Sequence, residues 1–176
     1  MKAEIEAQLG CLIGQPLSYM QRYAGCQRFS FGQAYEAKNR RGKEMIRYDY
    51  GVVISCLWEI FIEEVRIVGR TDFGPGDIRR DEDAKWFYKV VDTQQLIVKK
   101  IHGRSDGGFT MEFSDAVTLN LTPEFSRKQR YSKSEKKLRE MLLRDGELWR
   151  FMPKKQGNDY PSHFVVTADG WYGTDE

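Results

Sequence analysis

The chain has 176 residues, of which 40% are hydrophobic and 13% aromatic, and its net charge at pH 7 is +2. This length and apolar content suit one domain that buries a core without disulfides or a metal, and they exclude a disordered chain. The small net charge excludes the strong overall field of a histone-like or highly acidic protein.

The first predicted element is a short helix, because Ile5, Leu9 and Leu12 recur at helical spacing and the pattern ends at Gly14 and Pro16. The next residues are less regular. They predict, in chain order, a second helical turn over 17–23, a strand over 26–32, and a polar, basic and exposed hairpin connection over 33–43.

Residues 45–58 are predicted as the central strand of the fold. The even positions from Tyr48 to Trp58 are mostly apolar or aromatic, and the odd positions become apolar toward the end of the segment. A strand of this kind belongs inside a sheet that is covered on both sides, so Cys56 and Trp58 are assigned to packing. The hairpin that follows is expected to turn at Glu63–Glu64.

The most regular pattern lies between residues 96 and 123. Before it, the composition of residues 70–85 predicts a loop, and residues 86–91 fit either a helical turn or a strand. Short turns at 104–108 and 114–115 then separate extended segments, which predicts a three-stranded antiparallel meander over 96–102, 109–113 and 117–121.

A helix is predicted over 132–144, because Ser132 and Glu135 form a capping box and Gly146 suits a C-terminal cap. Strands over 147–152 and 162–168 complete the chain. The predicted fold class is therefore α+β, as one domain over 1–176. It consists of an antiparallel meander sheet or two-layer β structure with an N-terminal helix and a helix near residues 132–144.

The sequence contains no GxSxG, HExxH or Walker motif. His102 and His163 both fall in predicted strands, and neither has a Cys, Asp or Glu at metal-ligand spacing. The glycine-containing segment 104–108 joins two strands and opens no helix, so it is interpreted as a hairpin turn and not as a phosphate loop. We therefore predict no catalytic residue, metal ligand or cofactor. An enzyme with a carboxylate or histidine site assembled from distant segments is the least favoured alternative.

Charged residues offer two candidate contact surfaces. Carboxylates after the central strand are interleaved with arginines, which is typical of a solvated, salt-bridged surface. Their functional interpretation is an acidic patch for a protein partner, made of Glu63, Glu64, Asp72, Asp77, Asp81, Glu82 and Asp83.

Basic residues gather over 38–43 and again over 127–139. A polyphosphate would suit the second group, so the alternative is a nucleic-acid site at Lys133, Lys136, Lys137 and Arg139. Against it, Glu135 and Glu140 pair with these cations at i,i+4 spacing, and no aromatic residues alternate with them to stack on bases.

Six short fragments lie at 13–17, 29–32, 54–60, 68–72, 147–151 and 163–166. In this order they resemble a largely uncharacterised family of small bacterial α+β proteins, some of them associated with toxin-neighbouring immunity genes. The basic segment 38–43 and the charged helix from Ser132 depart from that family. The resemblance implies a single α+β domain with no enzymatic residues to transfer.

The leading hypothesis is a non-enzymatic protein-binding module, an immunity-type inhibitor of a bacterial toxin domain encoded nearby. Three scattered cysteines without a CxxC pair predict reduced thiols, and the N-terminal residues are too acidic for a signal peptide. Because no apolar run reaches the roughly 18–20 residues of a membrane span, we expect a cytoplasmic protein with no membrane partner.

Overall fold

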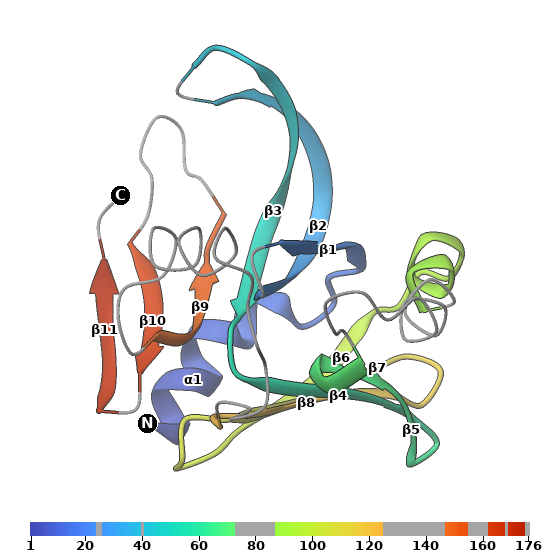
Figure 1. Ribbon diagram of the computed structural model, residues 1–176, viewed down its shortest axis with the longest axis vertical. Coiled ribbons are helices and arrows are strands. Elements are labelled where there is room, and N and C mark those ends of the chain that lie inside the picture. Colours follow the sequence, from blue (N-terminus) through green and yellow to red (C-terminus); the bar gives the residue numbers. More distant parts are fainter. Residues whose placement is uncertain are drawn as a thin grey trace.

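The computed structural model describes residues 1–23, 26–39, 41–72, 87–124, 147–154, 162–167 and 169–174. Within these ranges the chain forms two antiparallel β-sheets (Figure 1). The six-stranded sheet has the order β1 (Leu17–Tyr23), β2 (Cys26–Lys38), β3 (Glu44–Ile54), β9 (Glu147–Met152), β10 (His163–Thr167) and β11 (Gly170–Thr174). The five-stranded sheet has the order β5 (Val65–Gly69), β4 (Leu57–Ile62), β8 (Val117–Thr122), β7 (Phe109–Phe113) and β6 (Val98–Gly103).

Helical segments are short in this part of the chain. Helix α1 (Lys2–Leu9) continues into the 3-10 turn η1 (Gly10–Leu12), a second 3-10 turn η2 spans Arg70–Asp72, and residues 87–93 are helical. The N-terminal helix is thus confirmed, and the ambiguous segment around residue 88 is helical. The coarse prediction of a β-rich α+β fold with antiparallel sheets is also confirmed. The predicted helix near 132–144 lies outside the described residues.

The predicted central strand is in fact two strands that belong to different sheets. Strand β3 lies inside the six-stranded sheet between β2 and β9, as expected, but the chain leaves that sheet at Ser55 and enters the other as β4. The Ser55 hydroxyl is bonded to the carbonyl oxygens of Glu147 (2.6 Å) and Leu148 (2.8 Å), and its backbone N–H also donates to Leu148. These bonds pair buried backbone polar groups at the corner, where strand pairing is interrupted.

A second junction joins the two sheets where the edge strands β1 and β6 begin. The segment before β1 pairs with the segment that leads into β6: Leu17 N–H donates to the Leu96 carbonyl (2.8 Å) and Val98 N–H to that of Gln15 (3.0 Å). The two sheets therefore enclose one apolar core. Its largest members contact each other through ring edges, with centroids 5.5 Å apart for Phe29 and Trp58.

The hairpin and meander predictions are confirmed. Strands β4 and β5 are joined at Glu63–Glu64, and β6, β7 and β8 form the meander, in which β8 alternates buried and half-buried residues. The C-terminal strands are also present as β9 and β10. Strand β11 was not predicted, because its five residues include two glycines and have no clear apolar period.

Two predictions near the N-terminus are wrong. Residues 17–23 form strand β1 and not a helical turn. The three-residue spacing of Leu17 and Met20 favours a helix, but a β-bulge between Leu17 and Tyr19 lets both residues reach the core from a strand. Residues 33–43 are also not a loop. Strand β2 continues to Lys38 and β3 begins at Glu44, so only the tip of this segment is a turn. Its polar residues are compatible with a strand because neither face is covered by a core.

Candidate functional site

The two histidines lie on different sheets, His102 on β6 and His163 on β10. His102 is half exposed, and its Nε2 lies 3.4 Å from a carboxylate oxygen of Glu112 on the neighbouring strand. His163 is buried, with Nδ1 3.4 Å from a guanidinium nitrogen of Arg150. Over the described ranges, no group of three or more His, Cys, Asp or Glu side chains could hold a metal ion.

The buried cysteines are structural. Burial raises the pKa of the Cys56 thiol to about 12, and Cys26 is buried against Val53. A thiol with that pKa is ionised to a fraction on the order of 10⁻⁴ at pH 8, so Cys56 is not an active nucleophile.

This assignment predicts a thiol-labelling pattern. At pH 8, iodoacetamide is expected to modify exposed Cys11 in the folded protein and to leave Cys26 and Cys56 unmodified, while all three react in urea. Intact-mass spectrometry and peptide mapping count and place the modified thiols. Rapid modification of Cys56 in the folded protein would contradict a closed core at the β3–β4 corner.

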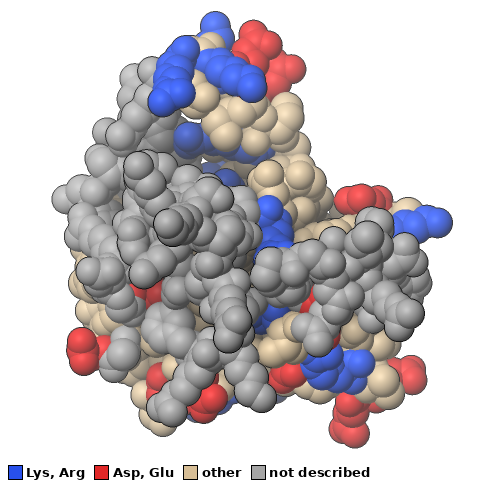
Figure 2. All heavy atoms as spheres, in the orientation of Figure 1, with Lys and Arg blue, Asp and Glu red and all other residues tan. Residues whose placement is uncertain are grey.

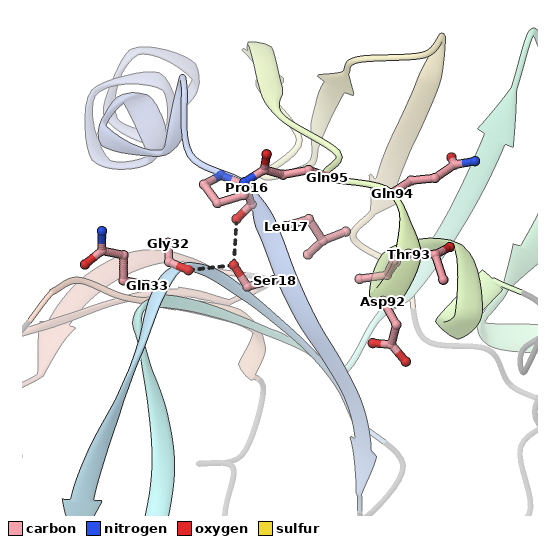
Figure 3. Close-up of a pocket in the computed structure, with 10 residues that line it drawn as sticks. Pro16, Leu17, Ser18, Gly32, Gln33, Asp92, Thr93, Gln94 and Gln95 are labelled. Atoms are coloured by element: carbon pink, nitrogen blue, oxygen red, sulfur yellow. Dashed lines mark hydrogen bonds between the residues drawn. The ribbon is translucent and has the colours of Figure 1, made fainter.

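A shallow groove of about 390 Å³ lies beside the middle of β2 (Figure 3). Gly32 and Gln33 form one side and Asp92 and Gln94 the other, with Ser18 between them. The Ser18 hydroxyl is bonded to the carbonyl oxygen of Gly32 at 2.6 Å and to that of Pro16 at 3.3 Å. No histidine or cysteine lines the groove, and Asp92 is its only carboxylate. The lining residues therefore form no nucleophile–base pair.

The predicted acidic patch is only partly described. Glu63 and Glu64 are exposed in the β4–β5 turn, and Val65 beside them is 63% exposed. Asp72 has a different environment: its carboxylate accepts bonds from Arg66 (2.9 Å) and from the Gly69 backbone N–H (2.7 Å). Asp72 thus stabilises the end of β5 through these bonds. The other members of the patch, Asp77, Asp81, Glu82 and Asp83, lie outside the described residues.

A second turn, which the sequence analysis did not assign to the patch, lies directly beside Glu63–Glu64. The Glu63 N–H donates to the Ala116 carbonyl at 3.2 Å, which joins the β4–β5 turn to the β7–β8 turn at Asp115–Ala116. Glu63, Glu64 and Asp115 are exposed, and no ion pair involves them in the part of the chain that the structure describes. We call these two turns the acidic end of the five-stranded sheet.

All four turn residues of the acidic end are in the left-handed region without being glycine. Their φ angles are 48° and 68° for Glu63 and Glu64 and 58° and 54° for Asp115 and Ala116. Two-residue hairpins with this geometry favour Asn-Gly, and a left-handed residue with a Cβ costs roughly 1–2 kcal/mol. Folding alone would therefore select other residues at this end of the sheet.

Relieving this strain is expected to stabilise the protein. The change Glu63→Asn with Glu64→Gly should raise the free energy of unfolding by about 1 kcal/mol and the Tm by about 3 °C. Thermal unfolding followed by circular dichroism measures the shift. The control Glu63→Gln with Glu64→Gln removes the same charges and keeps the strained backbone, so it should leave the Tm unchanged. Equal stabilisation by both variants would assign the effect to charge.

The described residues of the basic segment 38–43 form the tip of the β2–β3 hairpin, which extends beyond the other strands of its sheet (Figure 1). We call residues 33–39 and 41–48, the described part of β2, β3 and their turn beyond the bulge at Gly32, the arm. Figure 2 shows Lys and Arg side chains gathered at its free end, with acidic side chains to one side. Sequence reasoning identified the charges but assigned this segment to a loop; the alternation from Tyr35 to Lys38 was the signal for a strand.

The second basic group, with Lys133, Lys136, Lys137 and Arg139, lies outside the described residues.

Among the described residues, none of the helices has the length and apolar character that a membrane span requires. Comparisons with protein-family models, with curated proteins and with solved structures found no match for this chain.

Proposed function

We propose that the protein is a non-enzymatic protein-binding module of the immunity type, which acts in the bacterial cytoplasm and masks a toxin domain encoded nearby. The observation that carries the proposal is the acidic end. It presents three carboxylates without ion pairs among the described residues, next to an exposed apolar side chain, Val65.

The backbone of the acidic end supports a binding role. Strain at exposed residues persists where the side chains have a use that other residues could not supply. Glu63 and Glu64 occupy positions where Asn and Gly would fold better, so their carboxylates are the reason for their presence. A basic partner surface, such as that of a nuclease, would complement them and associate faster through charge attraction.

Val65 supplies the apolar part of the contact. It lies at the start of β5, the edge strand of the five-stranded sheet, and is the most exposed large hydrophobic residue of the described chain. An apolar side chain bordered by charges has the composition of a small interface centre with a polar rim.

The test is co-purification with the product of the neighbouring gene. The wild-type protein should retain that product, and Glu63→Lys with Glu64→Lys should release it at moderate salt. The control Asp92→Lys with Asp169→Lys makes the same charge change at two exposed sites away from the acidic end and should retain it. No retention by the wild type, or equal retention by both variants, would refute the proposal.

The alternative, a nucleic-acid-binding accessory protein that uses the basic helix at 127–144, stays a proposal whose residues lie outside the described chain. Its test is the salt dependence of binding after Lys136→Glu with Lys137→Glu, which should abolish binding if the helix holds the phosphates.

A further inference from the structure

The arm is a regular antiparallel hairpin with a hydrogen-bonded turn. Its strands pair in register from Ala34 with Tyr48 to Lys38 with Glu44. The turn is fixed by Asn39, whose side-chain oxygen accepts the backbone N–H groups of Arg41 (2.9 Å) and Lys43 (3.0 Å). Five paired positions span about 17 Å, so the arm carries its tip well clear of the sheets.

Glycine at the base of the arm sets its direction. A β-bulge interrupts the pairing between Phe31 and Ala34, and Gly32 within it has φ of +82°. A Cβ at Gly32 would lie 2.8 Å from the Cβ of Asp49, so only glycine fits. The Asp49 carboxylate accepts the Gln33 backbone N–H at 3.0 Å and holds the bulge.

The pairing register separates the charges of the arm onto two faces, because directly opposite residues share a face and successive residues alternate. One face carries both acids of the arm, with the members Ala34, Glu36, Lys38, Glu44, Ile46 and Tyr48. The other face carries no acid; its members are Tyr35, Ala37, Met45 and Arg47, and Lys43 continues it into the turn. We call this second set, with Arg41 of the turn, the basic face.

Two observations indicate that the basic face carries a net positive charge. Asp49, the next residue of that face toward the body, is ion-paired with Lys154 at 2.9 Å and is nearly buried. Arg41, Lys43 and Arg47 make no ion pair with any residue of the described ranges. Their charges are therefore available to an external anion.

We propose that the basic face of the arm binds double-stranded nucleic acid through its phosphate backbone. A two-stranded β-ribbon fits the major groove of B-form DNA, which is about 12 Å wide and 8.5 Å deep. The arm is such a ribbon and is longer than the groove is deep. Lysine and arginine at its tip and edge would contact the phosphates on either side, while Tyr35, exposed next to Arg47, would lie against sugar or base edges.

The charge pattern favours a polyanion over a protein partner for this surface. A protein interface of comparable size places apolar anchors at its centre. On the arm the most exposed apolar residue, Ile46, lies on the opposite face beside Glu36. The basic face contains flexible cations and one exposed aromatic ring, which suits phosphate contacts. The proposal is independent of the acidic end, which belongs to the other sheet.

The experiment measures binding of the full-length protein to a fluorescein-labelled duplex of roughly 20 base pairs by anisotropy, between about 50 and 200 mM KCl. The variant Arg41→Gln, Lys43→Gln and Arg47→Gln should weaken binding at least tenfold at the lowest salt. Because each phosphate contact contributes about −0.9 to the slope of log Kobs against log salt, the slope should become less negative by nearly 3.

Two matched variants separate the arm from general charge. The control Lys2→Gln, Lys99→Gln and Lys100→Gln removes three exposed cations from α1 and β6 and should leave the salt slope unchanged. The opposite-face variant Glu36→Gln with Glu44→Gln should not weaken binding. The thermal unfolding of all variants should match that of the wild type, because these side chains lie outside the core.

Three outcomes would overturn the proposal. The wild type could fail to bind the duplex at the lowest salt. The arm and control variants could lose affinity equally, which would mean diffuse attraction. A single strand of the same sequence could bind more tightly than the duplex and lose affinity with Tyr35→Ala, which would assign the arm to base stacking instead of groove insertion.

Discussion

Replacement of Trp149 with alanine is expected to lower the free energy of unfolding by about 3–5 kcal/mol. Trp149 is completely buried on β9 and packs against Phe109 in a T-shaped contact, with the ring centroids 5.1 Å apart. Its indole N–H also donates to the Gly107 carbonyl at 2.8 Å, so one side chain ties the six-stranded sheet to the β6–β7 turn of the other. Since small domains are stable by only about 5–15 kcal/mol, the variant should be partly unfolded at 37 °C.

A second substitution at the same site separates the hydrogen bond from the packing. The change Trp149→Phe keeps an aromatic ring but leaves the buried Gly107 carbonyl without this donor, which should cost about 1–3 kcal/mol. Urea unfolding followed by circular dichroism measures both variants. Trp171→Ala is the matched control, because Trp171 is 47% exposed on the edge strand β11 and should cost much less. Equal losses at the two tryptophans would show that Trp149 does not join the sheets.

The elements that were predictable from the sequence have residue patterns that fit only one type of secondary structure. Strict alternation from Phe109 to Leu121, with short polar turns, permits only a meander, and the N-terminal helix has enough turns to reveal its period. Residues 17–23 have two buried apolar residues at a helical spacing, and the β-bulge that places both in the core of a strand depends on the pairing with β2.

The corner and the arm required tertiary information. Nothing local to Ser55 signals the change of sheet, because the acceptors of its hydroxyl come from β9, about ninety positions along the chain. The arm was mistaken for a loop because its alternation covers only Tyr35 to Lys38 and most of its other residues are polar or charged. Its charge separation follows only from the register.

The same limit applies to the acidic end. Glu63 and Glu64 were identified from their charge, but Asp115 lies 51 residues farther along the chain and joins them only through the pairing of β4 with β8. Asp72 resembled them in sequence, and its contacts with Arg66 and Gly69 could not be read from composition. A surface is therefore predictable from sequence only as far as its members lie on one hairpin.

Removal of the Arg150 side chain should have the second large effect, a loss of about 3 kcal/mol of stability. Its guanidinium binds the Glu147 carboxylate through two nitrogens, at 2.6 and 2.5 Å, and the Glu147 side chain has no exposed surface. Alanine at position 150 would leave that carboxylate buried without its cation, and a buried unpaired charge costs more than the pair contributes. Urea unfolding of Arg150→Ala measures the loss.

A double substitution tests whether charge or shape explains the loss. Glu147→Leu with Arg150→Met replaces the pair by apolar side chains of similar volume, and such replacements of buried pairs are often neutral or stabilising. The double variant should therefore be more stable than Arg150→Ala, although it departs further from the native sequence. If it is less stable, the pair contributes through a fixed geometry that apolar packing cannot reproduce. Because Ser55 bonds to the Glu147 carbonyl at the β3–β4 corner, the loss would then extend to the junction of the two sheets and to the base from which the arm projects.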